Sequence, residues 1–260
     1  MKISNLLMSS VNTMDFNSLT TVEWIFIIST IAILPLILYS LFASIRVQLS
    51  FSKYSKIKVR SDMTAGQFAE QLLRENNCDV RVEKGHGHLS DHYDPRTQSV
   101  VLSPDVYDSN SIAAYGIAAH EVGHAIQDAT NYTPLKIRQL VIKSTGLINK
   151  LLLPIIIIGM IAQIFVYYDS PIFLYIILAF VVMYGLSFLV SVITLPTEFN
   201  ASNRAREMLR QSNLLEQSEQ RGASKVLSAA AMTYVAAMAV SLVYFLRYLS
   251  YLLILMGRRK

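Results

Sequence analysis

The chain has 260 residues, of which 53% are hydrophobic and only 16% are charged, and its formal net charge is +5. Charged residues make up about a quarter of an ordinary soluble domain, so this composition excludes such a domain. The positive charge does not indicate a nucleic-acid-binding protein, because the basic residues cluster beside apolar runs, where they set topology and meet anionic lipid headgroups. Cys78 is the one cysteine, which excludes an internal disulfide and a cysteine-based metal site.

Four apolar runs are long enough to cross a bilayer, which takes about 20 consecutive apolar residues. They lie at residues 24–44, 151–168, 171–194 and 228–256. The first run follows a polar segment, residues 1–23, and precedes a basic cluster, so we interpret it as a retained anchor rather than a secretory signal. The sequence therefore predicts a mainly α-helical, polytopic membrane protein with about four transmembrane helices.

The distribution of lysine and arginine beside these runs predicts the orientation of the chain. Segments 45–150 and 195–225 carry basic clusters next to the membrane, whereas the turn between the second and third runs carries none. The excess of positive charge on cytoplasmic loops places both segments in the cytoplasm. The basic tail, residues 257–260, would then lie outside if the fourth run crosses. A break at Arg247 that leaves the last stretch at the interface is the alternative.

Between the first two runs, residues 45–134 predict a small α+β domain at the membrane surface. A capping box at Thr64 and Gln67 predicts a helix over 64–77. Residues 80–82 and 99–103 predict short strands between turns, the second of them an edge strand. A further helix is expected over about 111–130, and residues 135–150 are expected to lie along the membrane as an amphipathic lead-in. The small side chains around Gly116 and Gly123 indicate that the helix over 111–130 packs closely against a neighbour.

The sequence H-E-V-G-H at residues 120–124 is the strongest functional signal in the chain. Residues four apart share one face of a helix, so His120 and His124 can bind one metal ion. Glu121 is the next residue along the helix after His120, where its carboxylate can hold a water molecule bound to that ion. This layout is typical of a zinc hydrolase, and we expect one Zn²⁺ per chain.

Catalytic zinc takes three protein ligands and leaves one position for water. No histidine follows His124, so the third ligand is expected to be a carboxylate. Glu198 directly follows the third apolar run, in a segment that we interpret as the start of a new helix over 195–225, and we predict it to be this ligand. Asp128 lies one turn beyond His124 and is better placed to support a ligand than to complete the site.

Three segments carry a resemblance to a known family. They are L-S-D-H-Y-D-P-R at 89–96, A-H-E-V-G-H-A-I-Q at 119–127 and L-P-T-E-F-N-A-S-N-R-A at 195–205. Together they resemble the YugP-type membrane zinc metallopeptidases of bacteria, which are similar to the gluzincin group that includes the HtpX-like and CAAX-prenyl proteases. The resemblance covers nearly the whole chain. It implies a zincin-like catalytic domain, peptidase activity and a place in the bacterial cell membrane.

The sequence departs from the wider group at one position. The third-ligand motif of that group reads E-x-x-x-D, and Ser202 stands here where the aspartate would be. The residue that orients a ligand histidine is therefore open among Asn200, Ser202 and Asp128.

The expected reaction is peptide hydrolysis, with Glu121 as the general base. A second donor must stabilise the negative charge that develops on the carbonyl oxygen. The candidates for this donor are His92, Tyr93, Tyr132, Arg204 and Tyr234. His92 and Tyr93 lie in a turn-like segment, where substrate contact and a structural turn are equally good interpretations.

The expected partners are the lipid bilayer and a protein or peptide substrate near it, and no nucleic acid. The rival hypothesis is a metal-stabilised membrane scaffold without turnover, against which Glu121 argues, because a structural zinc site has no use for a base. The alanine- and methionine-rich face of the fourth run is expected to serve helix packing rather than substrate binding.

Overall fold

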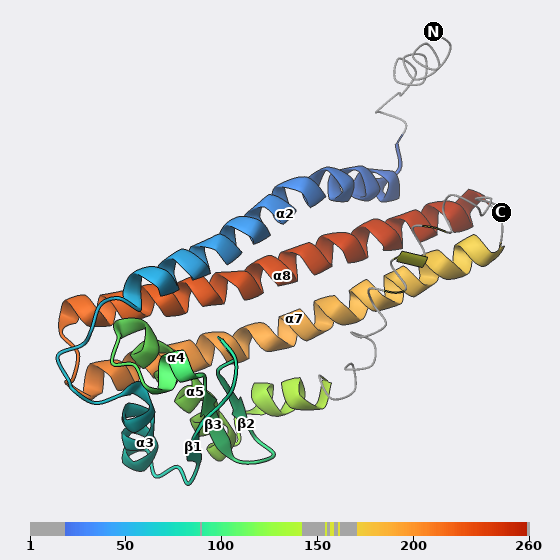
Figure 1. Ribbon diagram of the computed structural model, residues 1–260. Helices are drawn as coiled ribbons and strands as arrows, with labels where there is room; N and C mark the ends of the chain where they lie inside the picture. The colour runs from blue at the N-terminus through green and yellow to red at the C-terminus, as the bar shows by residue number, and fades with distance from the viewer. Residues whose placement is uncertain are drawn as a thin grey trace.

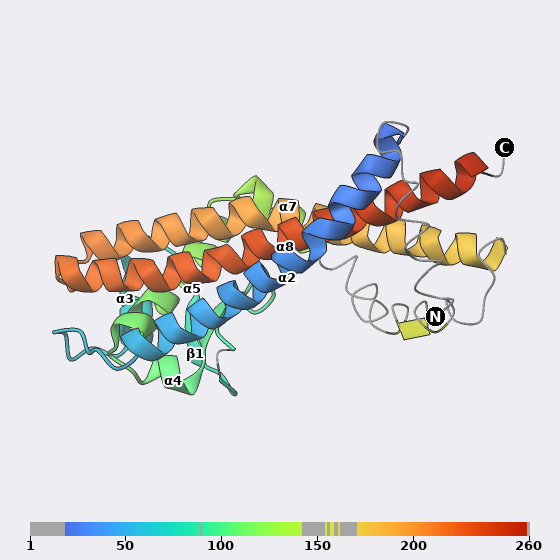
Figure 2. The same cartoon turned by 90° about the horizontal axis from the view of Figure 1, so that it is seen from above.

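Three long helices form the body of the computed structural model (Figure 1). They are α2 (Thr21–Tyr54), α7 (Pro171–Gln211) and α8 (Gln217–Arg258). The structure describes residues 19–88, 90–141, 154, 157, 158, 161 and 171–258. Helix α8 lies in the middle and packs against both α2 and α7, and α2 crosses it at an angle when seen from above (Figure 2).

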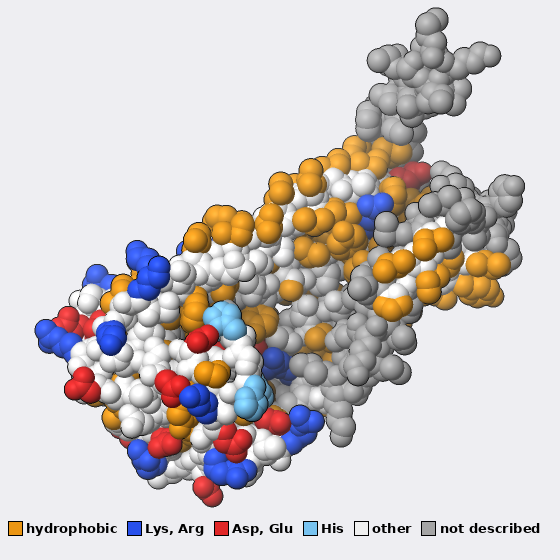
Figure 3. Space-filling view, viewed as in Figure 1, with side chains coloured by type: hydrophobic (Ala, Val, Ile, Leu, Met, Phe, Trp, Pro, Cys, Tyr) orange, Lys and Arg blue, Asp and Glu red, His pale blue; other side chains and the backbone are white. Residues whose placement is uncertain are grey.

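All three helices are long and apolar enough to cross a membrane. They confirm three of the predicted spans as helices, while most of the predicted span at 151–168, and residues 142–150 of the lead-in, lie outside the described residues. Hydrophobic side chains cover the length of the helices, and charged side chains gather at the end that carries the small sheet (Figure 3). This distribution fits a bundle in lipid with a domain at one surface.

The helices are longer than the hydrocarbon core of a bilayer is thick. At 41 residues, α7 extends about 60 Å, twice the roughly 30 Å of a bilayer core. The predicted start of a new helix at 195 is therefore wrong, because α7 runs without a break through Pro196. Likewise, α2 continues to Tyr54 and α8 begins at Gln217. Helix α7 therefore continues past its apolar run and carries Glu198.

Arg247 does not break α8, so the alternative of an interrupted last span is wrong. Its guanidinium lies 5.7 Å from the ring centroid of Phe26 and 6.0 Å from that of Tyr248. Aromatic faces attract a cation within about 6 Å, which offsets part of the cost of an arginine at this depth. The end of α8 lies with the start of α2, at the end of the bundle away from the sheet (Figure 1).

The small domain contains a three-stranded sheet in the order β1-β3-β2. Strand β3 (Ser99–Leu102) is central, parallel to β1 (Arg81–Lys84) and antiparallel to β2 (His92–Asp94). The expectation that residues 99–103 form an edge strand is wrong. The edge strand next to α5 (Ile112–Ala129) is β2. The sequence did not predict this strand, because residues 92–94, directly before Pro95, have the composition of a turn.

The predicted helices of this domain are confirmed. Helix α3 (Ala65–Glu75) begins with the expected capping box at Thr64, and α5 begins at its cap Ser111. The short α4 (Pro104–Tyr107) precedes α5, and residues 133–141 form a further helical segment.

Helix α5 is buried among its neighbours. Tyr115 stacks on Phe68 of α3 at a centroid distance of 4.4 Å. A Cβ added to Gly123 would lie 2.8 Å from the carbonyl oxygen of Ala201, so α5 and α7 are in backbone contact at this level. The close packing expected around Gly116 and Gly123 is confirmed, and it brings the H-E-x-x-H helix directly against α7.

Candidate metal centre

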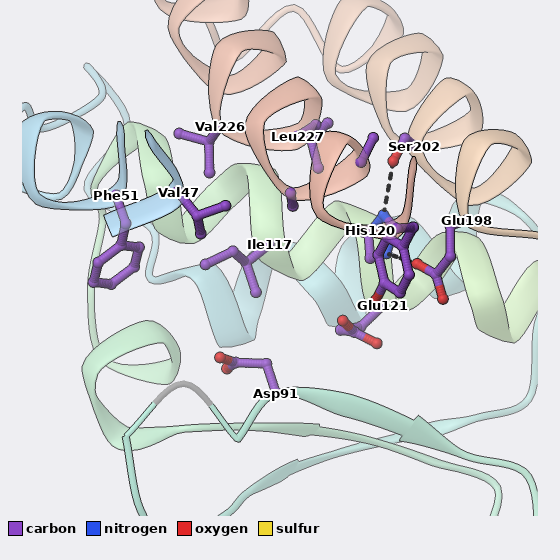
Figure 4. Close-up of a pocket in the computed structure, with 13 residues that line it drawn as sticks. Val47, Phe51, Asp91, Ile117, His120, Glu121, Glu198, Ser202, Val226 and Leu227 are labelled. Atoms are coloured by element: carbon purple, nitrogen blue, oxygen red, sulfur yellow. Dashed lines mark hydrogen bonds and ion pairs between the residues drawn. The ribbon is translucent and has the colours of Figure 1, made fainter. Parts of the chain in front are cut away.

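His120 of α5 and Glu198 of α7 lie side by side in one cavity (Figure 4). His124 of α5 also faces the Glu198 carboxylate. The Oε2 atom of Glu198 lies 3.3 Å from Nε2 of His120 and 3.6 Å from Nε2 of His124. One ligand atom from each residue lies within 4.8 Å of the other two, so the three can hold one metal ion. The four-residue spacing puts both imidazoles on one face of α5, and the backbone contact at Gly123 brings Glu198 to that face.

The chemistry of these atoms fits a metal ion. Glu198 is 2% exposed, and its Oε2 atom has no hydrogen-bond partner although it faces two imidazole nitrogens. A buried carboxylate oxygen without a partner carries a large desolvation cost, which a cation between the three atoms would offset. Two imidazole nitrogens and one carboxylate oxygen, with room for water, are a common donor set for catalytic zinc.

The other ring nitrogens of both histidines have partners. Ser202 Oγ lies 3.3 Å from Nδ1 of His120, and Gln127 Oε1 lies 3.0 Å from Nδ1 of His124. Hydrogen bonds at Nδ1 fix the ring and leave Nε2 available as a ligand. Gln127 was not among the sequence candidates, and its Nε2 also donates to Asn200 Oδ1 at 3.0 Å.

Of the three residues considered for orienting a histidine, Ser202 makes the direct contact and Asn200 acts through Gln127. Asp128 accepts a hydrogen bond from the Tyr93 hydroxyl at 2.9 Å and lines a separate cavity. The structure therefore does not bring Asp128 or Tyr93 to the metal centre.

Arg138 is a second residue that the sequence did not single out. It lies on the helical segment 133–141, and its Nη2 is 3.0 Å from Glu198 Oε1. This contact occupies one carboxylate oxygen and leaves Oε2 facing the histidines. No sequence pattern distinguishes this residue, because Arg138 belongs to a basic cluster expected to lie at the membrane surface.

Glu121 lies beside the three ligand residues and is 8% exposed. Burial raises the pKa of its carboxyl to about 7; the charge of His120 opposes this rise, and those of Glu198 and Asp91 add to it. A carboxyl with such a pKa can accept and return a proton near neutral pH.

The five residues expected as donors to the substrate carbonyl oxygen lie at different places relative to the metal centre. Among the five candidates, all of which are described, Tyr234 of α8 is the one that lines the cavity with His120 and Glu121. The Nδ1 atom of His92 lies 2.7 Å from the backbone oxygen of Ser90, and Arg204 Nε donates to Asn200 Oδ1.

The cavity beside the metal centre has a volume of about 240 Å³ and is lined by residues of α2, α5, α7, α8 and the loop before β2. Its lining consists of Val47, Phe51, Asp91, Ile117, His120, Glu121, Glu198, Ser202, Val226, Leu227, Ala230, Ala231 and Tyr234.

A family model described as "Putative neutral zinc metallopeptidase" matches residues 29–253, most of the chain. The chain belongs to this family of zinc metallopeptidases. It is 38% identical, over 229 residues, to the "Putative membrane protease YugP" of Bacillus subtilis (strain 168), a match that covers 86% of this chain and 95% of the relative. No solved structure matches the chain. Membership of the family confirms the resemblance carried by the three sequence motifs.

Proposed function

We propose that the protein is a membrane-embedded zinc peptidase that hydrolyses peptide bonds in membrane-associated proteins or peptides. The observation that carries the proposal is the buried Glu198 Oε2, which lies between two imidazole nitrogens and has no hydrogen-bond partner. His120, His124 and Glu198 would hold the ion. When bound, Zn²⁺ supplies Lewis-acid chemistry, polarising a carbonyl and making water a nucleophile at neutral pH.

Glu121 is the general base in this proposal. Its carboxylate accepts the proton of the attacking water and then delivers it to the amine of the leaving product. Its buried position beside His120 and Glu198 suits both steps, because the group must take up and release a proton within one cycle. A structural metal site would not need a buried carboxyl beside its ligands.

Tyr234 is the second donor in this proposal. Its hydroxyl would donate to the substrate carbonyl oxygen as negative charge develops there. Its place in the cavity beside Glu121 supports the assignment.

The membrane-associated substrate follows from the position of the site. The cavity lies between the projecting ends of α2, α7 and α8, which are long and apolar enough to be membrane spans. A substrate tethered to the same bilayer would meet this site at a high effective concentration. The basic clusters in 45–150 and 195–225 support a reaction on the cytoplasmic side of the bacterial cell membrane.

Zinc-loaded protein in liposomes would test the proposal with one peptide sequence, supplied either free or fused to a membrane-spanning anchor. We expect faster cleavage of the anchored form and a loss of about 10²- to 10⁴-fold in rate for Glu121→Gln. Equal rates for both forms would contradict the membrane-associated substrate. Zinc binding without cleavage of either form would favour a metal-stabilised scaffold.

A further inference from the structure

The cavity at the metal centre has a polar end and an apolar end. His120, Glu121 and Glu198 form the polar end. On the side away from Glu198, Val47 and Phe51 of α2 face Ile117 of α5, with Val226 and Leu227 of α8 beyond them (Figure 4). A substrate carbonyl at the polar end would therefore have an apolar recess immediately beside it.

The charge of the cavity limits what can enter this recess. Glu121 and Asp91 line the cavity, and no lysine or arginine is among the cavity's described lining residues. Both carboxylate oxygens of Asp91 accept hydrogen bonds from Ser103 Oγ, at 3.0 and 3.2 Å. These bonds hold the carboxylate at the wall of the cavity. An acidic side chain would meet like charges and find no cationic partner, whereas an apolar side chain would gain from burial.

Small residues of α8 leave the recess open. Ala230, which belongs to the alanine-rich face expected to serve helix packing, lines the cavity, as does Ala231. Ala229 and Ala236 are buried at 1% exposure and fit that expectation. A longer side chain at Ala230 would project into the space that a substrate side chain would occupy.

We propose that this recess, lined by Val47, Phe51, Ile117, Leu227 and Ala230, selects a large apolar side chain on one of the two residues that flank the scissile bond. The proposal rests on the proposed peptidase function, because it assigns substrate preference to the same site. Leucine, methionine and phenylalanine are the expected residues, and glycine, aspartate and glutamate are disfavoured.

Casein digestion by the zinc-loaded protein in detergent, with cut sites mapped by mass spectrometry, tests the preference. We expect cuts beside large apolar residues at least about tenfold more often than beside glycine, since each methylene in an apolar pocket changes selectivity by about 10- to 200-fold. Ala230→Leu should remove this preference and shift cleavage toward small residues. Ala237→Leu, at an exposed position of the same helix outside the lining, is the matched control and should leave the pattern unchanged.

The affinities of leucine hydroxamate and glycine hydroxamate for the zinc-loaded native protein give a second measurement that needs no turnover. Leucine hydroxamate should bind at least about tenfold more tightly. Cut sites without apolar enrichment, or a pattern that Ala230→Leu leaves unchanged, would contradict the proposed role of the recess and leave the peptidase function intact. If neither casein nor the membrane-anchored peptide is cut, the peptidase function fails. The hydroxamates then test the recess by itself: equal affinities contradict an apolar binding recess, and tighter binding of leucine hydroxamate supports it.

Discussion

At the scale of single residues, the two oxygens of Glu198 have different surroundings. Oε1 contacts Arg138 at 3.0 Å, and Oε2 faces the two histidines. The guanidinium thus fixes the rotation of the carboxylate and directs one oxygen to the metal position. Groups that orient a ligand typically contribute 10- to 100-fold to metal affinity.

Arg138→Gln should therefore lower zinc affinity by about 10- to 100-fold, because Glu198 loses the contact that orients it. The measurement is the concentration of a chelator that removes half the zinc from the detergent-purified protein. Lys136→Gln, at an exposed position of the same helical segment, is the control and should retain native affinity. Unchanged affinity in Arg138→Gln would show that the ion pair does not orient the ligand.

The sequence singled out the candidate ligand residues and Ser202 as a possible supporting contact, but not Arg138. His120 and His124 are four residues apart on one helix, so their convergence is a local property. Arg138 and Glu198 are sixty positions apart, and their contact depends on how the segment after α5 lies against α7. No local pattern distinguishes Arg138 from the other basic residues near the membrane.

At the scale of elements, the contact between α5 and α7 holds the site together. Gly123 allows this contact, because an added Cβ would lie 2.8 Å from the backbone oxygen of Ala201. Gln127 of α5 also donates to the carbonyl oxygen of Thr197 at 2.8 Å. The two helices can therefore carry their ligand residues at a fixed separation.

Gly123→Ala should force α5 and α7 apart, with a destabilisation of about 1–3 kcal/mol, as for other overpacked interiors, and weaker zinc retention. Gly116→Ala is the matched control, since its Cβ would meet Ala223 at an ordinary 3.5 Å and gain about 1 kcal/mol of helix propensity. Thermal unfolding and zinc content in detergent measure both effects. A Gly123→Ala protein as stable as Gly116→Ala would contradict the close approach.

Helix ends were predictable where capping residues mark them, as at Thr64 and Ser111. The segment Pro196-Thr197-Glu198 imitates such a start, because proline and an acidic residue are favoured in a first turn. Yet α7 continues through it, since a proline removes one hydrogen bond without ending a helix whose flanks are packed. Packing against α5 and α8 overrides the local signal.

At the scale of the whole molecule, the bundle separates two ends. The metal centre, the sheet and the loop between α7 and α8 lie at one end, and the start of α2 and the end of α8 lie at the other (Figure 1). With the basic clusters in the cytoplasm, the end of α8 is expected outside the cell.

Cysteine labelling in intact bacterial cells tests this orientation in a Cys78→Ser background. A membrane-impermeant maleimide should label Gly257→Cys at the end of α8 directly, and Arg60→Cys at the site end only after the cells are permeabilised. The opposite pattern would place the site outside. Direct labelling at both positions would contradict a bundle that crosses the membrane.

The zinc content of detergent-purified protein tests the central claim, that His120, His124 and Glu198 hold one metal ion. We expect one zinc per chain in the native protein, a large loss in Glu198→Ala, and native content in Glu207→Gln, a carboxylate of the same helix that pairs with Arg210. Glu121→Gln should keep its zinc and lose casein cleavage. Native zinc content in Glu198→Ala would contradict the assigned third ligand and, with it, the proposed centre.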